Sequence, residues 1–383
     1  MGILATEYLP ATGGMEQHAA SLIAHAAERL DVTLITWPQA APPTGRVRHV
    51  ASWTGFPGPD RVLIKAQPVD AWLVLNAGWL LDVAEGAQAI PLFAYVHGND
   101  FISPWVPGLS GPVALVDRLE RKLRMGDGGD GSHAARWWRR KRVITGLRRT
   151  RLIFANSHYT RGRCLDLCGL PDDRAQVVAP GIDDRHFKNM VRPRREGRLQ
   201  ILTVSRLSSK NRRKNVDGLL KALAIVRGEI DAELSVVGDG DDLPRLTALT
   251  KQLGISERVH FMGRLDDAAL DRAYESADLF VLAPRPSRSD VEGFGMVYVE
   301  AAARGLPVIG TAVGGVVDAI NDGVSGVFAE NASPEAIAAA LARFAASRKA
   351  FDPVRIRQFA ELHRAAATSR QLLGTIEALA VLE

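Results

Sequence analysis

The sequence predicts an α/β fold with two Rossmann-like domains, and three observations support this prediction. The chain has 383 residues, more than one hydrophobic core usually organises. Short apolar runs alternate with helix-like segments, and the runs lack the regular polar alternation of half-exposed strands. This rhythm stops at the polar, Pro-containing stretch 188–198 and then restarts, as expected of a linker between two α/β domains.

The composition is that of an ordinary globular protein, with 46% hydrophobic and 24% charged residues. We see no apolar run approaching the ~18 residues of a membrane span and no basic segment ahead of Ile3 that would mark a secretion signal. A cytoplasmic location is therefore expected. The two cysteines, Cys164 and Cys168, are four residues apart in a predicted helix, which indicates reduced, partly buried thiols and not a disulfide or a CxxC motif.

In the first half, six apolar runs are predicted to form a parallel sheet that helices cover on both faces. They are 3–8, 32–36, 72–75, 92–96, 152–155 and 176–178. Gly13 and Gly14 follow the first run, where backbone N–H groups can meet a phosphate or a sugar, although a tight turn alone would also explain them. His97 ends the fourth run and could bind a ligand hydroxyl, or could cap the local backbone.

A basic segment interrupts the first half. Between positions 118 and 151 there are twelve Lys or Arg residues and three acidic residues, although the net charge of the whole chain is only +5. The segment contains Arg136, Trp137, Trp138, Arg139 and Arg140, and paired tryptophans among cations are typical of a surface that meets anionic lipid or a phosphorylated acceptor. A solvated helix with its tryptophans buried in the domain is the alternative. No nucleic-acid-binding motif accompanies the segment, so nucleic acid is not an expected partner.

In the second half, six further runs are predicted strands: 199–204, 233–237, 259–262, 279–283, 307–309 and 326–329. Arg206 follows the first of them, and a basic loop, 210–214, leads into the next helix. Guanidinium and ammonium groups at this edge of a sheet suit a diphosphate, although a solvated basic loop would look the same. Asp239 and Asp241 match a metal-binding DxD pattern only weakly, because Gly and Asp are common in any strand-to-helix turn.

Two glutamates stand out in the stretch 279–310. Glu292 lies in a loop with Gly293 and Gly295, and Glu300 follows eight residues later in a predicted helix. If that helix starts near Phe294, the two carboxylates are at most about 12 Å apart along its axis and lie on roughly one side. Because retaining glycosidases need carboxyls about 5 Å apart, this spacing favours a long ligand held at two points. A helix with an acidic N-terminus and a second, solvated Glu is the alternative.

These residues together resemble a known family. The order of the motifs is similar to that of the retaining glycosyltransferases of family 4, which have the GT-B fold. The motifs that carry this resemblance are Gly13-Gly14-Met15-Glu16, His97, Pro180-Gly181-Ile182-Asp183, Ser205-Arg206-Leu207, Lys214, Glu292-Gly293-Phe294-Gly295 and Glu300. The resemblance implies two Rossmann-like domains that face each other across a central cleft. It divides the chain into an acceptor-side domain, 1–190, a donor domain, 191–365, and a C-terminal helix, 366–383, that returns to the first domain.

The resemblance also implies a reaction. A hexose would move from a nucleotide-diphosphate sugar to a hydroxyl, with retention of configuration and without a metal or other cofactor. The expected acceptor is a lipid-linked saccharide of a surface polysaccharide or lipopolysaccharide, which would bring the protein to the inner face of an anionic membrane. A soluble acceptor, such as a secondary metabolite, is the alternative within this class. A protein that binds a nucleotide sugar or an anionic partner without catalysis is the alternative from another class.

Residue roles follow from the same resemblance. Arg206 and Lys214 would bind the diphosphate, while Glu292 and His97 would contact the sugar, and these four form the implied catalytic set. The implied donor-binding residues are Gly14 for a phosphate or the acceptor, Arg264 near the base, Gly293, Phe294 and Gly295 beside the sugar, and Glu300 at the ribose. Two departures from the family pattern leave details open. The basic loop is long enough for Lys210 to replace Lys214, and the donor loop has an extra stretch at 285–290.

Overall fold

The computed structural model describes residues 1–6, 8–9, 13–37, 45–51, 61–87, 89–102, 115, 133–188, 197–210, 212–287 and 290–380. Within this part of the chain there are two compact units. The first contains residues 1–181 and 365–383, and the second contains residues 182–364. The second unit thus begins at Ile182, earlier than the predicted boundary at 190, and most of the predicted linker lies outside the described residues.

The first unit contains a seven-stranded parallel sheet, as far as the chain is described, in the order β3-β2-β1-β4-β5-β6-β7. Its strands are β1 (Gly2–Leu4), β2 (Val32–Thr36), β3 (Val47–Ala51), β4 (Trp72–Val74), β5 (Leu92–Val96), β6 (Leu152–Ala155) and β7 (Ala175–Val177). Its helices are α1 (Gly14–Ala27), α2 (Arg61–Lys65), η1 (Ala77–Trp79), α3 (Leu80–Ala87), α4 (Asn99–Ile102), α6 (His133–Arg148), α7 (His158–Cys168), η2 (Asp172–Arg174) and α15 (Ala365–Ala380).

The second unit repeats this plan with a six-stranded parallel sheet, in the order β10-β9-β8-β11-β12-β13. Its strands are β8 (Leu199–Val204), β9 (Ala232–Val237), β10 (Val259–Gly263), β11 (Leu279–Val281), β12 (Val308–Thr311) and β13 (Gly326–Ala329). Its helices are η3 (Asp184–Phe187), η4 (Arg212–Lys214), α8 (Val216–Val226), α9 (Leu243–Leu253), η5 (Ser256–Arg258), α10 (Asp267–Ser276), α11 (Met296–Ala303), α12 (Val316–Ala319), α13 (Pro334–Ala346), η6 (Arg348–Ala350) and α14 (Pro353–Glu361).

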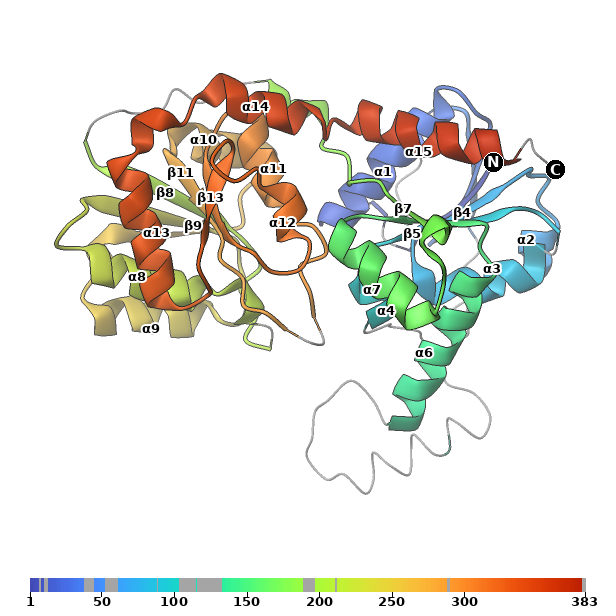
Figure 1. Cartoon of the computed structure of the whole chain (residues 1–383), viewed down its shortest axis with the longest axis horizontal. Helices are drawn as coiled ribbons and strands as arrows, with labels where there is room; N and C mark the ends of the chain where they lie inside the picture. The colour runs from blue at the N-terminus through green and yellow to red at the C-terminus, as the bar shows by residue number, and fades with distance from the viewer. Residues whose placement is uncertain are drawn as a thin grey trace. The chain divides into compact units, whose positions relative to one another are not determined.

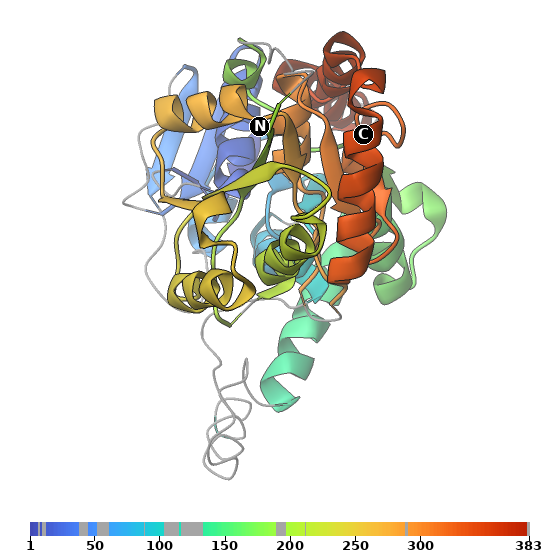
Figure 2. The ribbon, with the colours of Figure 1, turned by 90° about the vertical axis from the view of Figure 1, so that its left-hand side faces the viewer.

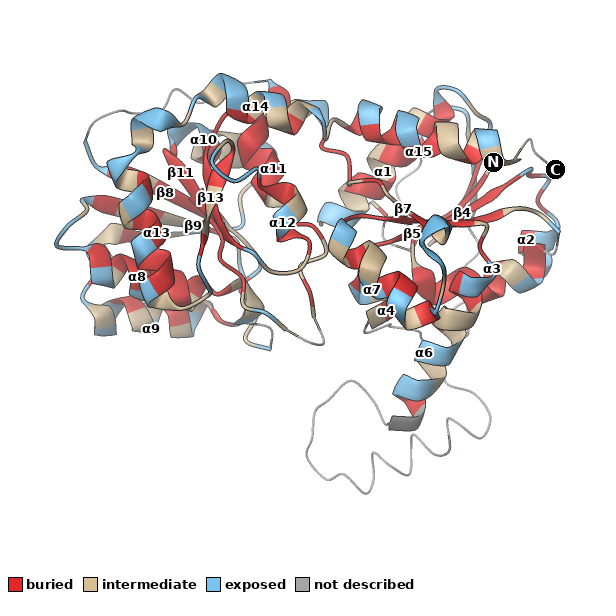
Figure 3. Ribbon diagram, viewed as in Figure 1, coloured by how far each residue is buried: buried red, intermediate tan, exposed pale blue. Residues whose placement is uncertain are grey.

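Helices cover both faces of each sheet, which explains why the strands read as continuous apolar runs. In β1, Ile3 belongs to the core beneath α1 and α15, and the adjacent Leu4 belongs to the core on the side of α3 and α6. In the second unit, α8 packs against α9 and α13. Figure 2 shows the yellow α9 below the strands and the light-orange α10 above them. Buried residues accordingly follow the strands in Figure 3, and exposed residues lie on the outer faces of the helices.

Three sequence predictions need correction. The strand β3 was missed because it lies at the sheet edge and is half-exposed, so its polar residues hide the apolar pattern. The first strand ends at Leu4, short of the predicted residue 8. The helix after Glu292 begins at Met296, not near Phe294, because Gly295 takes a left-handed conformation with φ 93°. Glu292 therefore belongs to the loop, and the helical spacing argument does not apply to it.

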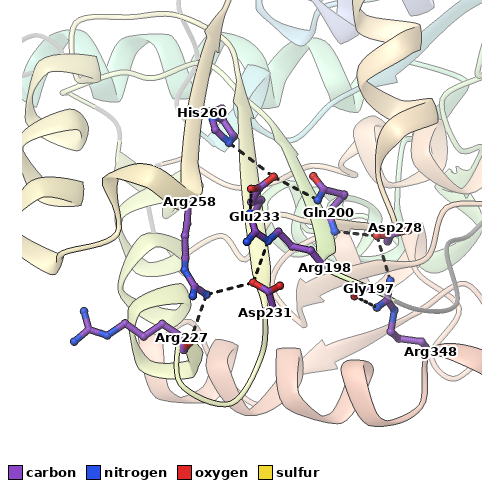
Figure 4. Close-up of polar contacts among 10 residues, drawn as sticks. All are labelled: Gly197, Arg198, Gln200, Arg227, Asp231, Glu233, Arg258, His260, Asp278 and Arg348. Carbon is purple, nitrogen blue, oxygen red and sulfur yellow. Dashed lines mark hydrogen bonds and ion pairs between the residues drawn. The ribbon is translucent and has the colours of Figure 1, made fainter.

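Each sheet has one point where the strand order reverses, between β1 and β4 in the first unit and between β8 and β11 in the second. In open α/β sheets, ligands bind beyond the carboxyl ends of the strands at such a point. The opposite end of the second sheet is occupied by ion pairs. Arg198 contacts Asp231 at 3.0 Å and Glu233 beside it, and Arg348 lies 3.2 Å from Asp278 (Figure 4). Asp278 also accepts a hydrogen bond of 2.9 Å from the backbone N–H of Gln200, so these contacts tie the amino ends of β8, β9 and β11 together.

Candidate active site

The carboxylate of Glu292 is the centre of an ionic cluster beyond β8 and β11. Its Oε2 atom is 2.7 Å from Arg213 Nη1 and 2.7 Å from Lys214 Nζ. The side chain is only 12% exposed. Burial raises the pKa of Glu292, but the charges of Lys214 and Arg213 outweigh burial and bring the pKa down to about 2. Glu292 is therefore ionised at neutral pH, and two cations share one of its oxygens.

Glycines hold the backbone of Glu292 in place. Its carbonyl oxygen accepts a hydrogen bond of 2.7 Å from the N–H of Gly315. Gly314 has φ +57°, and a Cβ at that position would lie 2.5 Å from the same carbonyl oxygen. Only glycine can let the two backbones approach this closely. The loop between β12 and α12 thus fixes the loop that carries Glu292, a contact that no sequence motif predicted.

The two cations come from η4, whose end is fixed by Asn215. Asn215 has φ 59°, the one positive φ among non-glycine residues in the described chain. Its buried side-chain amide donates to the carbonyl oxygens of Ala283 at 2.8 Å and Ala332 at 2.9 Å. These bonds join η4 to the end of β11 and so bring Lys214 to Glu292. Arg213 also contacts Asp290 at 3.1 Å. The sequence placed Arg213 in the basic loop 210–214 without indicating its contact with Glu292, and Asn215 was not predicted.

Arg206 and Lys210 lie at the same edge of the sheet, but in different surroundings. Arg206 is exposed after β8 and lines a shallow, open hollow together with Lys214 and Arg212. Lys210 is also exposed and lies near Asp241. Asp241 accepts hydrogen bonds from the backbone and hydroxyl of Ser209, so one member of the DxD pattern stabilises a turn. Lys214, and not Lys210, contacts Glu292.

Glu300 lies in a different environment from Glu292, inside α11. It is 8% exposed, and its Oε2 accepts a hydrogen bond of 3.3 Å from the hydroxyl of Tyr274. Burial raises its pKa, and the charge of Arg304 opposes that rise in part. Arg304 is itself buried, stacks over Tyr274 at 4.5 Å and donates to Nδ1 of His186 and to Asp271. The pKa values of the two glutamates thus shift in opposite directions, and the two side chains have different partners.

The other predicted donor-binding residues of the second unit lie around these two glutamates or at the end of β10. Phe294 is buried and packs its ring 5.5 Å from the ring of His363, which anchors the loop. Gly293 is half-buried beside it, and Gly295 is the N-cap residue that precedes α11. Arg264 is exposed and follows Gly263. Gly263 has φ +64°, and a Cβ added there would meet no atom within 4 Å.

In the first unit, His97 follows β5 and lies against other rings. Its imidazole is 5.0 Å from the ring of Tyr95 and 6.0 Å from that of His18. Burial lowers the pKa of His97 to about 4 and that of His18 to about 3. Asp100 accepts hydrogen bonds from the backbone N–H groups of His97 at 3.0 Å and Gly98 at 2.9 Å. This edge therefore carries neutral imidazoles at pH 7.

His18 was not predicted from the sequence. It lies in α1, where Nδ1 accepts a hydrogen bond of 3.2 Å from the backbone N–H of Gly181. Neutral His18 therefore carries its proton on Nε2. A lone histidine in an apolar helix face gives no signal that distinguishes this contact from ordinary packing. Gly14, which was predicted, is the exposed first residue of the same helix.

The tryptophans of α6 fit neither sequence interpretation completely. Trp137 is 61% exposed, with the Lys141 ammonium 5.1 Å from its ring. Trp138 is half-buried and packs against the core, with the Arg142 guanidinium 5.0 Å from its ring. Arg136 and Arg140 are exposed and Arg139 is half-buried. Residues 118–132 of the basic segment lie outside the described residues.

Three further observations concern the described residues. In α7, Cys164 and Cys168 are buried free thiols, more deeply buried than predicted. Groups of three or more His, Cys, Asp or Glu side chains placed to hold a metal ion do not occur in this part of the chain. Nor do the helices described here include one with the length and apolar character needed to cross a membrane.

Two family models together match most of the chain. Residues 12–186 match the model described as Glycosyltransferase Family 4, and residues 184–360 match that described as Glycosyl transferases group 1. The two matches meet near the boundary between the two units, so each model corresponds to one unit.

Relatives of known name agree with these models. A GDP-mannose-dependent alpha-(1-6)-phosphatidylinositol monomannoside mannosyltransferase of Mycolicibacterium smegmatis is 25% identical, over 89% of this chain and 88% of its own. The enzyme of the same name from Mycobacterium tuberculosis is 30% identical, over 65% of this chain and 68% of its own. A D-inositol 3-phosphate glycosyltransferase of Salinispora arenicola is also 30% identical, over 71% of this chain and 59% of its own.

A solved structure supports the fold. The crystal structure of HepE from Anabaena in complex with UDP superposes with a TM-score of 0.74, covering 99% of this chain and all of that one at 18% identity. Similarity at this identity concerns the fold alone, which is the two-domain GT-B fold. From the family models and the mycobacterial relatives, this chain belongs to glycosyltransferase family 4, and it is a glycosyltransferase.

Proposed function

We propose that the chain moves a hexose from a nucleotide-diphosphate sugar to a hydroxyl acceptor, with retention of configuration. One observation carries the proposal: Arg206, Lys214 and Glu292 converge beyond β8 and β11, where the strand order of the second sheet reverses. Such a point is the usual ligand site of an open α/β sheet, and two cations with an ionised carboxylate suit a ligand that has both phosphates and sugar hydroxyls.

The cations would bind the diphosphate. Arg206 and Lys214 line the same hollow, so both can reach one phosphate group. Fixed positive charge stabilises a departing nucleoside diphosphate most effectively when it is already in place before the bond breaks. These residues can therefore provide the charge neutralisation that a metal ion provides in other enzymes, and we propose that transfer proceeds without one.

The carboxylates would bind hydroxyl groups of the donor. Glu292 would accept hydrogen bonds from the sugar, assisted by backbone groups of Gly293, Phe294 and Gly295, and Glu300 would accept them from the ribose. Arg264 would lie near the base. This division of roles is supported by the different surroundings of the two glutamates, since Glu292 lies among cations and Glu300 beside Tyr274.

The residues of the first unit would bind a sugar hydroxyl and a phosphate or the acceptor. A neutral His97 can accept or donate a hydrogen bond to a sugar hydroxyl, and the N–H groups at Gly14 open a helix of 14 residues that favours phosphate or a polar acceptor. For same-face substitution, the departing phosphate oxygen would take the proton of the incoming hydroxyl. No side chain then has to act as nucleophile.

For the acceptor, we propose a lipid-linked saccharide at the inner face of an anionic membrane. The mycobacterial relatives are named for a phosphatidylinositol mannoside, which is a lipid-linked acceptor. On α6, exposed Trp137, Arg136 and Arg140 offer an aromatic ring and two cations to anionic lipid headgroups. The protein would then be cytoplasmic and peripherally attached. A soluble acceptor is favoured instead by the Salinispora relative, which is named for D-inositol 3-phosphate.

Vesicle co-sedimentation separates the two acceptor classes. The intact protein should sediment with phosphatidylglycerol-containing vesicles, and Trp137→Ala should reduce the bound fraction several-fold. Arg258→Ala, which changes a cation far from α6 in the chain, serves as the control. A protein that ignores anionic vesicles while transferring sugar to a soluble polyol would count against the lipid-linked acceptor.

A donor panel tests the reaction itself. Purified protein is incubated with UDP-, GDP- and ADP-sugars, alone and with lipid-linked and soluble acceptors, and released nucleotide is measured with and without EDTA. We expect transfer or slow hydrolysis with at least one donor, unaffected by EDTA. Binding without any release of nucleotide would favour a non-catalytic binding protein. Thermal unfolding with each donor identifies the ligand, because a molecule that binds the folded state raises the melting temperature.

A further inference from the structure

Arg213 and Lys214 contact the same oxygen of Glu292 at the same distance, 2.7 Å, yet the two cations are held very differently. The side chain of Arg213 is 10% exposed and also contacts Asp290 at 3.1 Å. The side chain of Lys214 is 26% exposed and lines the hollow that contains Arg206. Arg213 is therefore fixed in place, whereas the flexible Lys214 ammonium can turn toward a ligand in the hollow.

The extra stretch of the donor loop secures Arg213. At one end, the backbone N–H of Arg285 donates to the carbonyl oxygen of Arg213 at 2.8 Å, and the Arg285 guanidinium contacts Asp217 at 2.9 Å. At the other end lies Asp290, the second acidic partner of Arg213. The stretch thus holds Arg213 from two sides, which gives a structural reason for its presence in this chain.

We propose that Arg213 is a positioning residue for Glu292, which keeps a counter-ion on the carboxylate when Lys214 turns from Glu292 to the diphosphate of a bound nucleotide sugar. This inference rests on the proposed function, because it assumes that Lys214 binds the diphosphate. Without Arg213, the departure of Lys214 would leave a largely buried carboxylate without a cation. Such a group takes up a proton instead of staying charged.

Proton uptake therefore reports on Arg213. In the described part of the chain, the titratable groups around Glu292 and its cations are Arg213, Lys214, Asp290 and Tyr298. Burial raises the pKa of Tyr298 well above its usual value, so this phenol stays neutral. Nucleotide sugars have no phosphate that titrates near neutral pH. If Arg213 is absent, ligand binding should be accompanied by protonation of Glu292, and affinity should rise as pH falls.

The test compares the two cations one at a time. Calorimetric affinities for whichever of UDP-glucose, GDP-mannose or ADP-glucose binds the wild type are measured from about pH 8 to about pH 6. In Arg213→Gln we expect affinity to rise as pH falls, with a slope of up to about tenfold per pH unit, the limit for one linked proton. Arg213→Lys should restore the wild-type profile. Lys214→Gln should bind more weakly than wild type but without the slope, because Arg213 still neutralises Glu292.

The double variant Arg213→Gln, Glu292→Gln has no carboxylate to protonate, so its profile should also lose the slope. A wild-type profile in Arg213→Gln, a slope that survives in the double variant, or a slope in Lys214→Gln would each overturn the role of Arg213. The last of these stays measurable even if Arg213→Gln does not fold. Wild-type protein that binds none of the three donors would overturn the proposed function itself, and with it this inference.

Discussion

The carboxyl ends of the two sheets have the same architecture but opposite chemistry. Beyond the first sheet, His18, Tyr95 and His97 form a group of rings in which burial keeps both imidazoles neutral, with pKa values of about 3 for His18 and about 4 for His97. Beyond the second sheet, Glu292 stays ionised, with a pKa of about 2, between Arg213 and Lys214.

This difference shows how one fold provides two kinds of site. Both groups are largely removed from water, where an unpaired charge is costly. The first unit avoids that cost by having no charge in its ring group, which suits uncharged hydroxyls. The second unit balances its charge with two cations on one carboxylate, and a diphosphate can then replace the carboxylate as the partner of a cation. The four experiments below test this contrast, from the largest expected effect to the smallest.

The largest effect is expected for Glu292→Gln. Turnover should fall by about 10² to 10³-fold, because the substitution removes the negative charge that we propose contacts the sugar in the transition state. Affinity for the nucleoside diphosphate product should instead rise, because Arg213 and Lys214 no longer share their charge with a carboxylate. Initial rates and calorimetry measure the two quantities. If Glu292→Gln instead binds the nucleoside diphosphate more weakly and also turns over more slowly, Glu292 does not compete with phosphate for the cations.

A smaller effect is expected for Arg206→Ala. Loss of one charge-assisted hydrogen bond corresponds to about 1.5–3 kcal/mol, or roughly 10- to 100-fold weaker nucleotide binding. The matched control is Arg258→Ala at the opposite end of the same sheet, where Arg258 lies 3.9 Å from Asp231 (Figure 4). The control should leave affinity unchanged. Equal losses in both variants would mean that general surface charge, and not the edge beyond β8, attracts the nucleotide.

The fold was predictable because helices cover both sheets, so that nearly every strand appears as an apolar run. β3 escaped prediction because it lies at an edge and is half-exposed. That Glu292, Arg206 and Lys214 lie at the same edge of the second sheet was predictable, because all three follow strands in motifs whose order resembles a family; their roles stay predictions. The contacts of Asn215 and His18, and the pairing of Arg213 with Glu292, were not predictable, because they join residues 68 to 163 positions apart in sequence. Local patterns carry no trace of such contacts.

The third effect in order of size is a change in stability at the neutral edge, where His97 lies. In the folded protein the pKa of His97 is about 4, below its ordinary value of 6.5, so between these values the unfolded chain binds more protons. The stability that His97 contributes is therefore complete above about pH 6.5 and is lost as pH falls toward 4, at about 1.4 kcal/mol per pH unit. When urea unfolding is measured across this pH range, His97→Asn should take up about one proton fewer on unfolding than the wild type, so its stability should depend less on pH. An unchanged slope would mean that His97 is already protonated in the folded state.

The smallest effect is expected for Tyr95→Phe. The Tyr95 hydroxyl donates a buried hydrogen bond of 2.9 Å to the carbonyl oxygen of Val178. Three residues later in the chain, the backbone N–H of Gly181 donates a hydrogen bond to His18. Loss of this bond should lower the free energy of unfolding by about 1 kcal/mol, while the ring remains beside both histidines. Urea unfolding gives the stability, and calorimetry with the nucleotide sugar gives the affinity, which should not change. Weaker donor binding in this variant would mean that the neutral edge helps to bind the donor, and the division between an ionic donor edge and a neutral hydroxyl edge would then be wrong.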